Sequence, residues 1–251
     1  MAMTDLPNSR TEDDGSAVVR VLSYNIRSLR DDEDALARVI RACAPDLVFV
    51  QEAPRFFRWR KHAARLASKA DLVVLGGGAT AAGPALLCSL RVFVERTEDV
   101  LLPLTPGLHR RGLATAVVRI GGARVGLVST HLSLAREERY AQAGAALDAL
   151  RGLGVPHGLL AADVNEEPSG AAFGLLAGSL QDAFAVAPLG GAGDTFPAVA
   201  PGRRLDAVFA TKGVEVLGCG VPLGLPGVSP GDLVAATDHL PVLAALRLPA
   251  A

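Results

Sequence analysis

The sequence predicts an α/β protein in which two β-sheets pack face to face and helices lie outside them. Short apolar segments recur along the chain, few stretches have helical periodicity, and several neighbouring strands are close enough to form hairpins. This mixture fits two packed sheets better than an alternating parallel array of strands and helices. No change in composition marks a linker within the 251 residues, so residues 17–251 are expected to form a single domain.

The composition narrows the class of protein. The net charge of −1 provides no global basic field for a polyanion, and no apolar run reaches the roughly 18 residues of a membrane span. The three cysteines are far apart and do not suggest a disulfide framework. Residues 1–16 are polar and acidic, lack a signal-peptide pattern and are expected to form a disordered tail. Because no signal-peptide pattern is found, we expect a cytoplasmic protein, although export by an unrecognised route stays open. We also expect a monomer.

The first fifty residues predict two strands with one helix between them. Residues 17–24 alternate as a strand that ends at Asn25. Residues 31–44 have apolar side chains at helical spacing and acids in the first turn, and Pro45 stops the helix. Residues 46–50 form a buried strand that brings Gln51 and Glu52 to its end.

A basic and aromatic segment, residues 55–65, is expected to open a helix that continues to Ala70. One interpretation is an amphipathic helix with Phe56 and Trp59 in the core. The other is a basic wall beside a site that binds a polyanionic substrate.

Further strands are expected after this helix. They cover residues 72–75, 85–94, 100–104, 113–120, 123–130, 204–210, 214–219 and 242–248, and helices are expected at 137–150 and 171–176. The strands at 113–120 and 123–130 form a hairpin across Gly121 and Gly122, which ends near His131. The segment 220–231 is expected to be a loop, and its apolar residues suggest an apolar lip.

The stretch from Gly158 to Pro168 is an apolar run that ends at Asp163 and opens into a loop. The two-residue period of a strand puts Asp163 and Asn165 on one side if the backbone stays extended. Glu166 and Glu167 follow directly and are expected to face solvent rather than bind a metal.

Polar side chains recur where apolar strands end, and they are Asn25, Glu52, His131, Asp163 with Asn165, Asp206, and Asp238 with His239. Ionisable groups at the edge of a core are costly unless they are paired. Carboxylate and amide oxygens suit hard cations such as Mg²⁺, Mn²⁺ or Ca²⁺, and the histidines suit proton transfer. This inventory fits metal-assisted hydrolysis of a phosphate ester.

Each of these residues also has a structural interpretation when it is taken alone. Asn25 suits a turn, Glu52 a solvated acid and His131 a satisfied core position, while Asp163 and Asn165 suit an Asx turn. Asp206 could pair with Arg203 or Arg204, and Asp238 could cap the last strand. Their joint occurrence at successive strand ends favours a functional site.

The sequence resembles the endonuclease/exonuclease/phosphatase superfamily in six ordered pieces that span residues 18–248. The pieces are Ser23–Asn25, Pro45–Glu52, Ser129–Leu132, Ala162–Asn165, Arg204–Phe209 and Thr237–Val242. The resemblance implies a four-layer αββα sandwich with its site at one rim. The sequence departs from the family pattern at Arg27, where abasic-site enzymes carry an acid, and at Ala162, where glycine is usual.

The resemblance also implies roles for the residues at matching positions. Glu52 would be the main metal ligand, helped by Asn25, and Asp238 would be a further ligand or hold a metal-bound water. Asp163 would orient or deprotonate water, and Asn165 and His131 would bind the scissile phosphate. His239, paired with Asp206, would stabilise phosphoryl charge or shuttle a proton. In the loop 105–112, Arg110 and Arg111 are candidates for substrate contacts.

Three functions are compatible with these residues. The favoured one is a Mg²⁺-dependent phosphodiesterase that acts as a nuclease on DNA or RNA. The second is a phosphodiesterase or phosphatase that acts on a small-molecule or lipid phosphate. The third, a binding module without activity, is disfavoured because the apparent catalytic set is retained.

Overall fold

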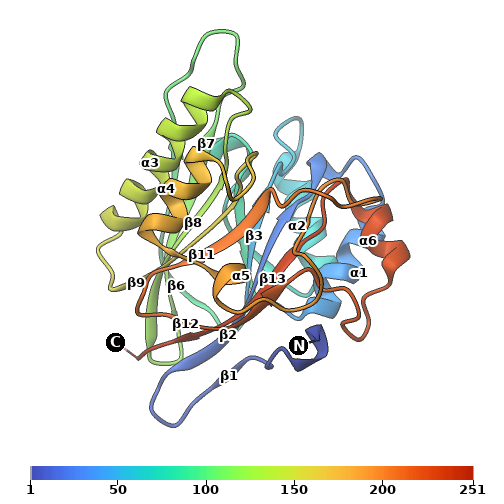
Figure 1. Ribbon diagram of the computed structural model, residues 1–251, viewed down its shortest axis with the longest axis vertical. Helices are drawn as coiled ribbons and strands as arrows, with labels where there is room; N and C mark the ends of the chain where they lie inside the picture. The colour runs from blue at the N-terminus through green and yellow to red at the C-terminus, as the bar shows by residue number, and fades with distance from the viewer. Residues whose placement is uncertain (1, 251) are drawn as a thin grey trace.

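The computed structural model of the protein describes residues 2–250 and has four layers (Figure 1). Two mixed β-sheets pack against each other, and helices cover their outer faces. The predicted four-layer α/β sandwich is therefore confirmed. None of the helices within residues 2–250 has the length and apolar character needed to cross a bilayer.

The first sheet has seven strands. Six of them lie in the order β12 (Glu215–Gly220), β13 (Val242–Leu248), β2 (Ala17–Asn25), β3 (Leu47–Gln51), β5 (Ala85–Cys88) and β4 (Val73–Gly77). The short strand β1 (Arg10–Thr11) pairs with β2. Strands β2 and β3 are parallel, so both end at the same edge of the sheet.

The second sheet has six strands. Their order is β10 (Gln181–Asp182), β11 (Asp206–Ala210), β9 (His157–Asp163), β8 (Ala123–His131), β7 (Gly112–Ile120) and β6 (Phe93–Leu101). The predicted hairpin is confirmed, since Ile120 pairs with Ala123 across the two glycines. Strands β8 and β9 are parallel, and their last residues, His131 and Asp163, are register partners.

Three apolar clusters hold the layers together. The inner cluster joins the two sheets through fully buried residues such as Phe49 and Leu127. Helices α1 (Glu33–Cys43), α2 (Trp59–Lys69) and α6 (Pro230–Ala236) cover the first sheet, and α3 (Arg136–Gly152) and α4 (Ala171–Ser179) cover the second (Figure 1). The remaining helical pieces are short: α5 (Ala183–Val186), η1 (Met3–Asp5), η2 (Arg27–Leu29) and η3 (Gly78–Ala81).

Helix α1 illustrates how the local sequence sets an element. The Asp32 carboxylate accepts hydrogen bonds from the amides of Asp34 and Ala35, both at 2.9 Å, which caps the first turn. Ala44 adopts the left-handed conformation just before Pro45 and ends the helix. The apolar stripe between these ends is buried against the first sheet.

The predicted disordered tail is not observed over residues 2–16, and Met1 lies outside the described residues. Met3 and Leu6 are buried in the cluster under the first sheet, and Arg10 and Thr11 pair with β2. The Arg20 guanidinium donates to the carbonyl oxygens of Leu6 and Pro7, both at 3.0 Å. Two apolar side chains and a buried guanidinium thus fix a segment whose composition is polar.

Other boundaries differ from the prediction, among them the strand expected at 100–104, which is the end of β6. The expected strand 85–94 breaks because Asp46 binds both Ser89 and Arg91, and β5 and β6 then belong to different sheets. Helix α2 begins at Trp59 rather than at the start of the basic segment, because residues 54–58 form a loop. Helix α6 is not among the expected helices, the predicted loop 220–231 covers only its first two residues, and its N-terminus is capped by Ser229.

The apolar lip predicted for residues 220–231 is also wrong. Val221, Leu225 and Val228 are buried in the cluster that includes α1 and α6. These side chains complete the core beneath the helices, so they do not provide an apolar surface for a ligand.

Candidate active site

The polar residues predicted at strand ends meet at one rim of the sandwich. Asn25 ends β2, and Glu52 follows the end of the parallel strand β3. His131 and Asp163 end β8 and β9, while Asp206 begins β11 opposite Asp163 in the antiparallel register. The parallel pairs and the single antiparallel pair therefore bring residues that are far apart in sequence to one edge.

Asn25 joins the two sheets. Its amide nitrogen donates to Asp163 Oδ2 at 2.9 Å and to Glu52 Oε1 at 3.3 Å. The Asn25 side-chain oxygen accepts from the Arg27 amide at 3.1 Å. In this orientation the Asn25 side chain positions the carboxylates of Glu52 and Asp163. A rotation of its side-chain amide group by about 180° would instead point the amide oxygen toward the space between these two carboxylates.

Glu52 offers a carboxylate whose charge is not neutralised by a basic side chain. Its side chain is 39% exposed and faces a cavity. Among residues 2–250, no lysine or arginine nitrogen lies within 4.0 Å of it, and the nearest histidine nitrogen is His131 Nδ1 at 3.8 Å. A carboxylate beside an amide in a cavity is a donor set that fits a hard divalent cation.

Two site residues have a backbone conformation that is uncommon outside glycine. Glu52 and Asn165 both have φ of 54°. Such residues persist only where the surrounding contacts hold them, and they concentrate at functional sites. An extended backbone was assumed at Asn165 from the sequence, and this conformation replaces it. The backbone N–H of Asn165 donates to Asp163 Oδ1 at 3.0 Å.

Asp163 is buried at the centre of the site. Burial raises the pKa of its carboxyl group and Asp206 adds to the increase, while His131, His239 and Asn25 oppose it. A carboxylate with a raised pKa is a stronger base than one in water. Asp163 is therefore suited to accept a proton from a water molecule in the cavity.

His131 is buried beside Asp163. Burial lowers the pKa of His131 to about 4, although Asp163 opposes this shift, so the ring is neutral near pH 7. The Asn165 amide nitrogen lies 2.8 Å from His131 Nε2 and donates to the Leu132 carbonyl at 2.9 Å. Both amide protons are then used, which favours Nε2 as the acceptor and the ring proton on Nδ1, 3.8 Å from Glu52 Oε1, although Asp163 Oδ2 also lies 3.3 Å from Nε2. Asn165 thus orients His131.

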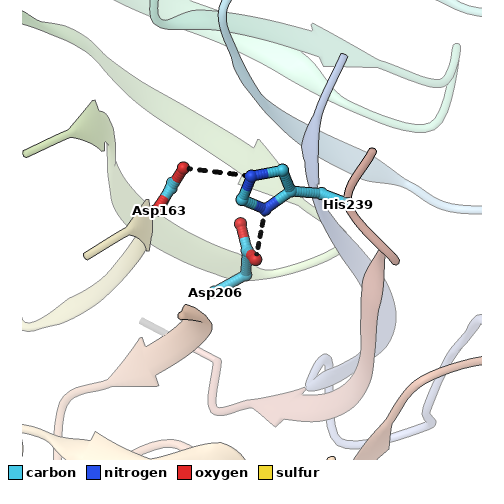
Figure 2. Close-up of side chains that lie close together, drawn as sticks. All are labelled: Asp163, Asp206 and His239. Carbon is cyan, nitrogen blue, oxygen red and sulfur yellow. Dashed lines mark hydrogen bonds and ion pairs between the residues drawn. The ribbon is translucent and has the colours of Figure 1, made fainter. Parts of the chain in front are cut away.

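His239 lies between two aspartates, as Figure 2 shows. Its Nδ1 is 2.8 Å from Asp206 Oδ2, and its Nε2 is 3.8 Å from Asp163 Oδ2. Burial disfavours the imidazolium, but the charge and hydrogen bond of Asp206, together with the charges of Asp163 and Asp238, outweigh burial and raise the pKa of His239 to about 9. The ring is consequently a cation at neutral pH.

Asp206 is held by its surroundings. The Thr195 hydroxyl oxygen accepts from the amides of Leu205 and Asp206, and the Phe196 ring lies 4.8 Å from that of His239. Asp206 Oδ1 is buried without a hydrogen-bond partner among residues 2–250. The structural alternative of a pair with Arg204 does not occur, because Arg204 binds Asp182.

Asp163, Asp206 and His239 also satisfy a geometric criterion for a metal site, since their ligand atoms lie within 4.8 Å of one another. The imidazole, however, already occupies the space between the two carboxylates (Figure 2). A cationic ring bonded to Asp206 is a proton donor and charge carrier, so we do not assign a metal to this triad.

A cavity of about 310 Å³ opens onto these residues. Glu52, His131, Asp163, Asn165 and His239 line it together with four basic side chains, Arg30, Arg55, His109 and Arg111. Burial lowers the pKa of Arg111, while Asp163 and Glu52 oppose the shift, and a guanidinium keeps its charge at neutral pH. The cavity combines two carboxylates with a basic wall, which is suited to an anionic ligand.

Not every expected residue takes part. Arg111 lines the cavity, but Arg110 is exposed and does not. Asp238 does not line the cavity either, and it pairs with Arg27 at 3.3 Å. Asp238 therefore faces Arg27, the residue that stands where abasic-site enzymes carry an acid, and its role as a metal ligand stays a prediction.

Glu166 is outside the site, as expected, but it does not face solvent. Its carboxylate pairs with Arg139 at 2.9 Å and accepts from the amides of Ala172 and Phe173 at the start of α4. It therefore caps a helix.

The sequence did not single out Arg30 or His109, whereas Arg55 belongs to the segment 55–65 for which a basic wall beside the site was one of two interpretations. Each lies in a loop rather than at a strand end, so strand periodicity provides no signal for it. The only clue for Arg55 was the density of basic residues in its segment.

Comparisons with known proteins agree with this arrangement. A family model described as the Endonuclease/Exonuclease/phosphatase family matches residues 22–239. A search of curated protein sequences finds no match.

Solved structures of low sequence identity share the fold. An endonuclease/exonuclease/phosphatase from Bacteroides vulgatus has a TM-score of 0.78 and 20% identity, covering 92% of this chain and 99% of its own. The mannosyl-6-phosphatase of Bacteroides thetaiotaomicron has a TM-score of 0.73 and 16% identity, covering 91% of this chain and 99% of its own. Truncated TDP2 of Caenorhabditis elegans has a TM-score of 0.71 and 20% identity, covering 91% and 97%.

The family match includes the site residues from Asn25 to His239, of which His239 lies between α6 and β13 rather than at a strand end. The chain belongs to the endonuclease/exonuclease/phosphatase family, whose members are phosphoester hydrolases.

Proposed function

We propose that this chain is a divalent-metal-dependent phosphoesterase that hydrolyses phosphodiester bonds, with nuclease-like activity on DNA or RNA. The observation that carries the proposal is the pairing of Glu52, which has no basic partner within 4.0 Å among residues 2–250, with the buried base Asp163 in one basic-walled cavity. Glu52, with Asn25 turned to present its oxygen, would hold Mg²⁺; Mn²⁺ and Ca²⁺ are alternatives with the same ligand preference.

The bound cation would neutralise charge on the phosphoryl oxygens. Asp163 would accept a proton from water as the water oxygen attacks phosphorus, because its raised pKa makes it an effective base. As the phosphorus–oxygen ester bond breaks, the leaving oxygen needs a proton, and the His239 imidazolium is the cationic donor nearest to Asp163. The products would be a phosphomonoester and an alcohol.

The remaining residues would bind and orient. Arg111 supplies a guanidinium for the non-bridging phosphoryl oxygens. His131, fixed by Asn165, directs its Nδ1 proton toward the cavity side where Glu52 lies. Asp206 holds His239 in its charged form and in one orientation. Direct phosphate binding by Asn165, expected from the resemblance, would require it to give up its bonds to His131 and Leu132.

The alternative is a phosphatase or phosphodiesterase on a small-molecule or lipid phosphate. The mannosyl-6-phosphatase with the same fold makes this class a necessary comparison. The size of the cavity, about 310 Å³, accommodates a sugar phosphate as well as one nucleotide unit.

A substrate panel tests the proposal. The purified chain would be assayed with Mg²⁺ and with excess EDTA on single- and double-stranded DNA, RNA, bis(p-nitrophenyl) phosphate, mannose 6-phosphate and sphingomyelin vesicles. We expect hydrolysis of the diesters and of nucleic acid, and its loss in EDTA. Hydrolysis confined to the monoester or the lipid would overturn the nuclease assignment, and full activity in EDTA would overturn metal dependence.

A cytoplasmic location and a monomeric state stay predictions. The three cysteines are free and buried. Gel filtration with light scattering would measure the oligomeric state directly.

A further inference from the structure

A loop beside the cavity exposes two adjacent phenylalanines. Residues 54–58, here called the aromatic loop, connect the segment after Glu52 to helix α2. Phe56 is 75% exposed and Phe57 is 81% exposed, so the expectation that Phe56 is a core residue is wrong. Two large apolar side chains in water cost hydration free energy, and an exposed pair beside a cavity suggests a contact surface.

The base of the aromatic loop is fixed to the cavity wall. The Ala53 amide donates to the Gly83 carbonyl at 2.8 Å, and Arg55 Nη1 donates to the Ala82 carbonyl at 3.3 Å. Arg55, Ala82 and Gly83 all line the cavity. Phe56 and Phe57 follow Arg55 directly, so their Cα atoms lie within about 8 Å of its Cα atom, although neither ring lines the cavity itself.

The same segment is strongly basic. No acidic residue occurs between Glu52 and Asp71. The Arg58 guanidinium lies 5.0 Å from the centre of the Phe57 ring, and the Arg60 guanidinium lies 4.2 Å from that of Trp59. Among residues 2–250, no carboxylate lies within 4.0 Å of Arg55, Arg58, Arg60 or Lys61. Their charges are available to an anionic ligand.

We propose that Phe56 and Phe57 form a base-stacking subsite that makes single-stranded nucleic acid the preferred substrate. The scissile phosphate would occupy the cavity, neighbouring bases would stack on the two rings, and Arg55 and Arg58 would contact flanking phosphates. Exposed rings can stack only on bases whose faces are free, and the faces of bases in a duplex are already stacked. This inference rests on the proposed function, because it concerns the substrate of the same cavity.

A binding experiment separates the inference from catalysis. Asp163→Asn would serve as the inactive background, and a fluorescein-labelled oligothymidine of about 12 nucleotides would be titrated by anisotropy at fixed salt. We expect each of Phe56→Ala and Phe57→Ala in this background to weaken binding about fivefold or more, the loss typical of one stacked base. A duplex of equal length is expected to bind more weakly than the single strand.

Phe93→Ala provides the matched control. Phe93 is a phenylalanine that is 59% exposed and has an arginine, Arg119, 4.8 Å from its ring, but it lies on β6 and does not line the cavity. Its substitution removes the same side chain from the surface and is expected to leave oligonucleotide affinity within about twofold.

Any of three oligonucleotide-binding results would overturn the inference: unchanged affinity in both aromatic-loop variants, equal weakening by the control, or tighter binding of the duplex than of the single strand. Vesicles containing phosphatidylserine would be tested in parallel, because exposed phenylalanines and arginines also suit an anionic membrane. Vesicle binding that depends on Phe56 and Phe57 without oligonucleotide binding would also refute it. If oligonucleotides bind through the two rings but no phosphodiester is cleaved by the unsubstituted chain, the proposed function fails while the subsite stands.

Discussion

Replacement of Asp206 by asparagine tests the charge state of His239, on which the proposed proton donation depends. The substitution keeps the size of the side chain but removes the carboxylate that lies 2.8 Å from Nδ1. The pKa of His239 is raised from 6.5 to about 9, a difference of about 2.5 units that corresponds to about 3 kcal/mol. In Asp206→Asn burial still lowers the pKa, whereas the Asp163 and Asp238 carboxylates remain and raise it, so we expect the pKa to fall to about 6.5, the ordinary value.

The change in pKa sets the expected change in rate. At about pH 8, a histidine with a pKa of about 9 is about 90% protonated, whereas one with a pKa of about 6.5 is about 3% protonated. If the imidazolium is the active form, kcat/KM for bis(p-nitrophenyl) phosphate at this pH should fall about 30-fold in Asp206→Asn. The loss should shrink toward lower pH, where the ring is charged in both proteins.

Rates measured across the pH range at saturating Mg²⁺, with an NMR titration of the His239 ring, provide the assay. We expect the alkaline limb, where activity falls as pH rises through about 9, to move down by about two pH units in the variant. An alkaline limb at the same pH in both proteins, or a ring pKa near 6.5 in the unsubstituted protein, would refute the reasoning. His239→Ala, which has no such titration, is the control for limbs that arise from other groups.

Further changes test the other roles. Glu52→Gln should raise the Mg²⁺ concentration for half-maximal activity at least about tenfold, because one ligand charge is lost. It should also abolish the increase in Tm that Mg²⁺ gives the unsubstituted protein, and an undiminished Tm increase would place the cation elsewhere. Asp163→Asn should lower kcat by about 10²- to 10⁴-fold with the fold intact by circular dichroism, since it removes the base; a loss below threefold would contradict that role. Glu166→Gln should lower the free energy of unfolding by about 1 kcal/mol in urea titrations, because it weakens the cap of α4 and the pair with Arg139. Activity should be retained. A loss of kcat matching that of Asp163→Asn would show that Glu166 belongs to the site.

The sequence predicted the parts of the site that depend on a strand. An apolar run that ends at a polar residue marks both the buried length of a strand and the side chain at its end. This is why Asn25, His131 and Asp163 were found, and why β13 was expected with its observed bounds, Val242–Leu248. The order of such strand ends along the chain was sufficient to suggest the family.

The tertiary structure alone decided which of these residues meet. The bond from Asn25 to Asp163 joins residues 138 positions apart and crosses from one sheet to the other, so it depends on how the sheets pack. The pairing of Asp238 with Arg27 likewise depends on two segments from opposite parts of the chain. Periodicity reports which face of one element is buried, but it contains no information on the distance between elements.

Loop positions and surface exposure were also beyond the sequence. Arg30, Arg55 and His109 reach the cavity from three separate loops, and Phe56 is exposed because the helix begins after it, at Trp59. The segment 2–16 is ordered because Met3 and Leu6 pack into the apolar cluster of the first sheet and its helices. The polar composition of the segment does not indicate this packing. The amino-acid sequence determined the strands and the side chains at their ends, whereas the packing of the two sheets and the paths of the loops determined which side chains share one cavity.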